Sequence, residues 1–82
     1  MRLPGIHEVY DVIDKMIHPF ILPDILVELS KPEWTYWEEV KMKNLIKKAL
    51  SQQMKYGTIR RTGDVIPSGF GNSYFVYVKV EA

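Results

Sequence analysis

The amphipathic pattern of one long helix dominates this 82-residue chain. Its apolar residues recur at three-and-four spacing, which places them on one face of a helix. These residues are Met42, Leu45, Ile46, Ala49, Leu50 and Met54. Thr35 and Glu38 form the capping box that begins a helix, and Gly57 is the residue type that ends one. The pattern predicts a helix from Tyr36 to Tyr56.

The length of the chain limits it to one core. A chain of this size buries only about 60 to 65% of its unfolded surface, so we expect a single domain over residues 1–82. The long helix is unusual in such a domain, and a break near Glu39 or Val40 is an open alternative. The chain has no cysteine, and no apolar run reaches the about 18 residues of a membrane span. We therefore expect a soluble protein of the cytoplasm or nucleus.

Two shorter helices are expected before the long one. The inward face of the first carries Ile6, Val9, Tyr10, Ile13, Met16 and Ile17. This helix should end near His18–Pro19, because proline disfavours helix at the preceding residue. We expect Phe20–Leu22 to be extended. Pro23 suits a first helical turn and Asp24 its positive end, so a second helix should begin there and stop before Pro32.

Two strands and a loop are expected after the long helix. Residues 58–62 form a short segment rich in β-branched side chains. In residues 74–80, the side chains alternate in the manner of a strand. The segment between them is rich in turn formers, namely Gly63, Asp64, Pro67, Ser68, Gly69, Gly71, Asn72 and Ser73. It is too long for a tight turn. The expected fold is α+β, with three helices followed by a two-stranded β-hairpin.

Charge is distributed unevenly along the chain, although its net value is only +1. Residues 41–62 contain no acid and seven bases, which are Lys41, Lys43, Lys47, Lys48, Lys55, Arg60 and Arg61. Residues 1–40 contain eight acids and three bases. Such asymmetry suggests a polyanionic partner, because clustered cations raise the local phosphate concentration. A solvated cationic helix face is the alternative interpretation.

The second half of the chain resembles the winged-helix superfamily. The resemblance rests on residues 44–63, a lysine-rich helix followed by glycine and a strand. It also rests on residues 67–75, a glycine-serine loop that leads into an aromatic strand. Within the superfamily, residues 55–59 and the segment from Ser68–Gly69 to Phe75 are similar to the linker-histone globular domain. Linker histones are far more basic around this domain, so the resemblance implies the winged helix-turn-helix fold and a DNA-binding surface without chromatin compaction.

By this resemblance, the exposed face of the third helix enters the major groove of double-stranded DNA and the loop acts as the wing. Lysine suits phosphate or guanine, and asparagine suits adenine. Backbone amides of a glycine-rich wing can approach phosphate closely. The candidate DNA-binding residues are Lys41, Asn44, Lys47, Lys48, Ser51, Lys55, Arg60, Arg61, Ser68 and Asn72. The resemblance implies a small transcriptional or replication-related regulator, which we expect to act as a homodimer on two half-sites.

A protein partner is the main alternative. Trp34, Tyr36 and Trp37 crowd the start of the long helix, where they can pack into the core, stack on bases or form an interface. Phe70 in the loop can wedge into a DNA groove or fold back on the strands. In this interpretation the basic face binds an acidic protein, for example as a mobile-element-encoded adaptor or inhibitor. RNA binding is a third interpretation.

The histidines do not predict a metal site. His7, Asp11, Asp14 and His18 are placed by spacing on one face of the first helix. On that helix the two histidines stand about 16 Å apart, too far to share an ion. The chain also has no nucleophile elbow, phosphate-binding loop or paired-carboxylate motif. We expect no metal, no cofactor and no enzymatic activity.

Overall fold

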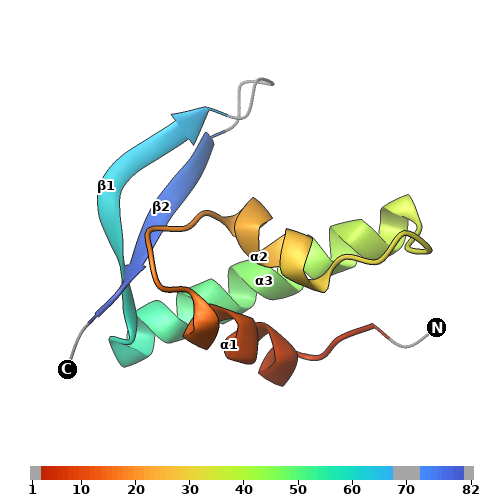
Figure 1. Cartoon of the computed structure of the whole chain (residues 1–82), viewed down its shortest axis with the longest axis horizontal. Helices are drawn as coiled ribbons and strands as arrows, with labels where there is room; N and C mark the ends of the chain where they lie inside the picture. The colour runs from red at the N-terminus through yellow and green to blue at the C-terminus, as the bar shows by residue number, and fades with distance from the viewer. Residues whose placement is uncertain (1–2, 68–72, 81–82) are drawn as a thin grey trace.

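Three helices come first in the chain and two antiparallel strands follow, as Figure 1 shows. The elements are α1 (Ile6–Lys15), α2 (Leu22–Leu29), α3 (Tyr36–Tyr56), β1 (Ile59–Pro67) and β2 (Ser73–Lys79). This computed structural model describes residues 3–67 and 73–80. The order confirms the expected α+β fold class and is consistent with a winged helix.

Helix α1 ends earlier than its apolar spacing predicts. The helix stops at Lys15, and Met16 already adopts an extended conformation with φ −69° and ψ 124°. Ile17 is 93% exposed, so its predicted place on the buried face is wrong. The chain leaves the helix before His18–Pro19 because an extended segment has to carry Phe20 to the sheet.

Phe20 joins the helical part of the molecule to the hairpin. Its backbone pairs with that of Tyr77 in an antiparallel bridge, with N···O distances of 2.9 Å and 2.8 Å. The two rings stack with centroids 6.0 Å apart. This confirms the extended conformation expected here, although α2 begins at Leu22, within the segment predicted to be extended. As predicted, Pro23 and Asp24 lie in the first turn of α2. In addition, the Asp24 carboxylate accepts a 2.9 Å hydrogen bond from the Ile21 amide.

Helix α3 is continuous over 21 residues, which excludes the break near Glu39 or Val40. The predicted capping box is confirmed. The Thr35 amide donates to Glu38 Oε1 at 3.0 Å, and the Glu38 amide donates to Thr35 Oγ1 at 3.2 Å. Gly57 ends the helix in the left-handed conformation, with φ 80°. Local hydrogen bonding therefore fixes both ends of the longest element.

The hairpin begins at the C-terminal end of α3 (Figure 1) and is longer than the sequence predicts. Residues 63–67 were expected in the loop, but β1 continues through them and pairs with residues 73–75 of β2. The pairing contains an irregularity. Three residues lie between Arg61 and Val65 on β1, whereas only Val76 lies between their partners Tyr77 and Phe75 on β2. Gly63 within this irregularity has φ 96°. The predicted wing residues Ser68, Phe70 and Asn72 lie outside the described residues.

All three helices and both strands contribute to one core. Its buried side chains are Val9, Ile13, Phe20, Leu22, Ile25, Leu26, Met42, Ile46, Ala49, Leu50, Ile59 and Tyr77. The predicted stripe of α3 is therefore inside, with Leu45 and Met54 partly buried against it. Lys79 Nζ donates to the carbonyl oxygen of Asp14, which fastens the end of β2 to α1. None of the helices in the described ranges 3–67 and 73–80 combines the length and apolar character needed to cross a membrane.

Candidate nucleic-acid interface

The face of α3 opposite the core is polar and cationic. Lys41, Asn44, Lys48, Ser51 and Lys55 are all exposed, as the helical spacing predicts. They extend along about 21 Å of the helix at 1.5 Å per residue. No acidic residue occurs on α3 after Glu39. This α3 face therefore presents a row of cationic and hydrogen-bonding side chains to solvent.

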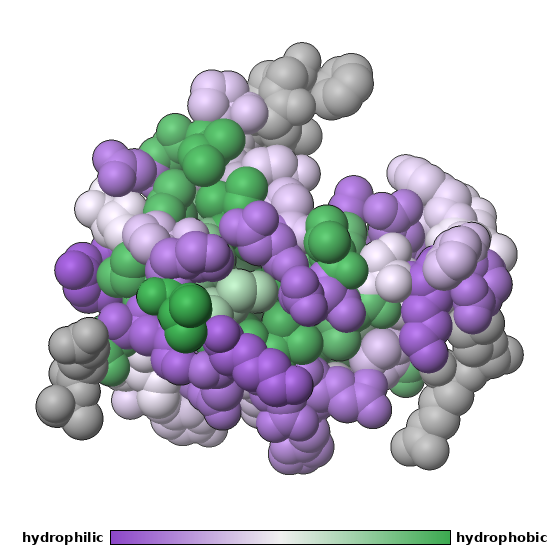
Figure 2. Space-filling model, in the orientation of Figure 1, coloured by the Kyte–Doolittle hydropathy of each residue, from purple (hydrophilic) through white to green (hydrophobic). Residues whose placement is uncertain are grey.

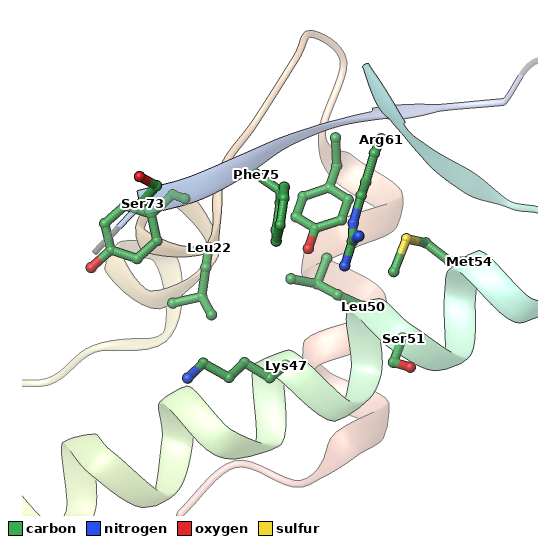
Figure 3. A pocket seen from close by; sticks show the side chains of 10 residues that line it. Leu22, Lys47, Leu50, Ser51, Met54, Arg61, Ser73 and Phe75 are labelled. Carbon is green, nitrogen blue, oxygen red and sulfur yellow. The ribbon is translucent and has the colours of Figure 1, made fainter. Parts of the chain in front are cut away.

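A second group of predicted residues lies in a groove between α3 and the hairpin. Lys47 and Ser51 reach it from α3, and Arg61 reaches it from β1, as Figure 3 shows. The groove has a volume of about 390 Å³. None of the described residues that line it is acidic. The groove and the α3 face share Ser51, so they form adjoining surfaces.

Arg61 is held in the groove by an aromatic ring. Its guanidinium carbon lies 4.0 Å from the centroid of the Phe75 ring, which is a cation–π contact. Arg60 points elsewhere, because successive strand residues face opposite sides of a sheet, and it does not line the groove. The hairpin therefore separates the two arginines that the sequence places together.

Acidic and basic side chains are also distributed unevenly over the folded protein. Helix α1 packs with Val9 and Ile13 in the core, and its Glu8, Asp11 and Asp14 are exposed. Figure 2 shows hydrophilic side chains gathered over α1 and a hydrophobic patch over the hairpin. Because α1 packs against the buried side of α3, its acidic side chains lie across the core from the lysines of the α3 face.

The three aromatic residues near the start of α3 have different environments. Trp34 is half-buried and packs against the core, and its indole Nε1 is buried without an acceptor among the described residues. Tyr36 and Trp37 are 70% and 71% exposed. Their rings meet edge to face with centroids 5.3 Å apart. Only this exposed pair is placed to contact a partner, and Trp37 continues the α3 face one turn before Lys41.

The side chains considered for metal binding do not share one helix face. His18 lies beyond the end of α1, so its predicted placement on the same helix face as His7 is wrong. Within residues 3–67 and 73–80, no three histidine, aspartate or glutamate side chains gather closely enough to hold an ion.

The sequence did not reveal the apolar part of the groove. Leu22, Met54 and Phe75 line it together with Arg61, yet they come from three separate parts of the chain. Phe75 stands beside Arg61 because Arg61 pairs with Tyr77, and Phe75 lies two residues from Tyr77 along β2. Helical spacing places Lys47 and Met54 on one side of α3, but no sequence signal gives the strand register.

Comparisons of the chain with protein-family models, with curated proteins and with solved structures found no match. The physical character of the α3 face and of the groove is therefore the basis for the function proposed below.

Proposed function

We propose that this protein is a winged helix-turn-helix protein that binds double-stranded DNA through the α3 face and the hairpin. The supporting observation is the row formed by Lys41, Lys48 and Lys55, interleaved with Asn44 and Ser51, on an exposed helix face. Lysines at this spacing suit a regularly charged polyanion, because each can neutralise a phosphate and release its counterions.

The dimensions of α3 fit this role. An α-helix with its side chains is about 10 to 12 Å wide, and the major groove of B-DNA is about 12 Å wide. With α3 in the groove, Asn44 is suited to pair with adenine, and the lysines contact phosphates or guanine. Lys47 and Arg61, on the hairpin side of α3, contact the adjacent backbone in this arrangement.

The proposed role is that of a small transcriptional or replication-related regulator in the cytoplasm or nucleus. A homodimer would gain affinity by placing two α3 helices on half-sites about 34 to 36 Å apart. Helix α1 and the exposed Tyr36 and Trp37 pair are the candidate dimer surfaces.

Salt dependence of duplex binding tests the proposal. Fluorescence anisotropy of a labelled random duplex of about two helical turns should report binding that weakens as salt rises. Five phosphate contacts, by Lys41, Lys47, Lys48, Lys55 and Arg61, give a slope of log affinity against log salt of about −4 to −5. Absence of binding at low salt would contradict the proposal.

A charge-reversal pair tests which surface binds. The double variant Lys48→Glu with Arg61→Glu should lower duplex affinity by at least about tenfold, because both residues are proposed phosphate contacts. The matched control is Lys15→Glu with Lys31→Glu, which makes the same charge change at exposed positions outside the α3 face. Circular dichroism checks that all variants fold. Equal affinity of the two double variants would show that the proposed surface is wrong.

An acidic protein partner is the second candidate function. The observation that favours it is the exposed pair of Tyr36 and Trp37 beside Lys41, because aromatic side chains are enriched at protein interfaces. If duplex binding is absent at low salt, affinity capture with Trp37→Ala as the control variant tests this alternative.

A further inference from the structure

The groove between α3 and the hairpin is a candidate site for a small molecule, and it adjoins the α3 face at Ser51. Its volume of about 390 Å³ falls within the range of about 300 to 1,000 Å³ that is usual for ligand sites. Figure 3 shows its side chains converging from α2, α3, β1 and β2. A pocket built from four elements of one core is largely formed before a ligand arrives, which lowers the entropy cost of binding.

The walls of the groove are mostly apolar. Leu22 and Leu50 are buried core residues that also reach its surface, and Met54 is half-buried beside them. Phe75 is 46% exposed, so one ring of the wall remains open to solvent. An apolar ligand that covers these side chains removes hydrocarbon surface from water.

Two cations reach the same groove from different elements. Lys47 comes from α3 and Arg61 from β1. Stacking on Phe75 restrains the Arg61 guanidinium, whose planar fork of donors matches a carboxylate or sulfonate. No acidic side chain among the described lining residues competes for these donors. The site therefore combines an apolar wall with unopposed positive charge.

We propose that this groove binds a small, flat aromatic anion, namely an aromatic ring that bears a carboxylate or sulfonate group. The ring lies among Leu22, Met54 and Phe75, and the anionic group lies between Lys47 and Arg61. Charge complementarity selects an anion over a neutral or cationic ring. The proposal requires only the groove, so it holds whether or not the protein binds DNA.

The test uses 8-anilinonaphthalene-1-sulfonate, an apolar aromatic anion that fluoresces when it leaves water. Titration of the whole protein should show one saturable site, and the uncharged N-phenyl-1-naphthylamine should bind more weakly. Lys47→Gln and Arg61→Gln should each weaken affinity by about tenfold through loss of a charge-assisted contact. The matched controls, Lys43→Gln on α3 and Arg60→Gln on β1, lie outside the groove and should leave the affinity within about twofold.

Chemical-shift mapping on the unmodified protein locates the probe independently of any variant. The amide signals of Ser51, Met54, Arg61 and Phe75 should move together and saturate at one probe per chain. The proposal is overturned if the largest shifts lie elsewhere, for example around Ile17, or if the neutral probe binds as tightly as the sulfonate. Equal effects of Arg60→Gln and Arg61→Gln on affinity would also overturn it.

Discussion

Glu38 has a structural role at the start of α3 that depends on its charge. Its carboxylate accepts the Thr35 amide, and this hydrogen bond lowers the pKa of Glu38 below its ordinary value. Nearby positive charge, including that of Lys41, acts in the same direction. The carboxylate is also favoured there by the positive end of the helix dipole.

The lowered pKa of Glu38 predicts a pH dependence of stability. A carboxyl group whose pKa is lower in the folded state stabilises that state above its ordinary pKa of about 4.3. The contribution disappears as pH falls through the lower, folded-state pKa. Urea unfolding should therefore show Glu38→Gln less stable than the parent protein at pH 7, with the difference shrinking at acidic pH.

The control for this experiment is Glu33→Gln, which removes a nearby exposed carboxylate outside the capping box. At pH 7, the stability that Glu33→Gln loses relative to the parent protein should be smaller than the stability that Glu38→Gln loses. If the difference in stability between Glu38→Gln and the parent protein stays constant from neutral to acidic pH, the role assigned to the charge is contradicted.

At the scale of single elements, the sequence predicted best where one local interaction decides the structure. The capping box and Gly57 correctly predicted the first and last residues of α3. The interior of α3 followed from one repeating pattern, and its polar residues Lys41, Lys48 and Lys55 are exposed as expected. These features depend on contacts within about five residues, which a sequence pattern contains.

The sequence failed where distant contacts decide the structure. Ile17 continues the apolar spacing of α1, but the helix ends at Lys15 because the following segment pairs with β2. Gly63, Asp64 and Pro67 are typical of a loop, yet β1 accommodates them through an irregular register and pairing with β2. The groove also depends on distant contacts, because its walls come from α2, α3 and both strands. Its cationic residues Lys47 and Arg61 were therefore predicted from charge, but its apolar wall was missed.

Gly57 provides a quantitative test of how α3 ends. A Cβ atom at this position meets no atom within 4 Å, so the cost of Gly57→Ala is the left-handed backbone alone. We expect a loss of about 1 to 2 kcal/mol in the free energy of unfolding. Gly57→Asn should cost less, because asparagine tolerates this conformation better.

The matched control is Gly5→Ala before α1. This residue has φ −89° and also has open space around its Cβ position. Urea unfolding should show a smaller loss of stability here than at Gly57, because Gly5 is the N-cap of α1 and alanine is disfavoured there only as a capping residue. Equal losses at Gly5 and Gly57 would mean that the backbone conformation at Gly57 is not the cause.

At the scale of the whole molecule, the proposed DNA surface and the groove share side chains. Lys47, Ser51 and Arg61 line the groove, and all three belong to the proposed DNA surface. An anion that occupies the groove neutralises charges that a phosphate backbone would otherwise contact. The two proposed ligands should therefore oppose each other.

This antagonism gives a prediction that joins both proposals. Anilinonaphthalene sulfonate at saturating concentration should weaken duplex affinity by about fivefold or more, and the duplex should weaken binding of the probe by the same factor. Anisotropy of a red-labelled duplex measures the first effect, and probe fluorescence measures the second. If the probe binds and the duplex does not, DNA binding fails while the anion site stands. If both bind without affecting each other, the shared surface is wrong.

The bridge between Phe20 and Tyr77 has a consequence for how the molecule assembles. These residues are far apart in the sequence, yet they exchange both backbone hydrogen bonds in the interior. Closing so long a loop costs entropy, and only the packed helices can offset that cost. The hairpin therefore acquires its fixed orientation together with the helices, as one cooperative unit. The Phe20 and Tyr77 amides should be among the slowest in the chain to exchange with deuterium, because they open only when the whole domain unfolds.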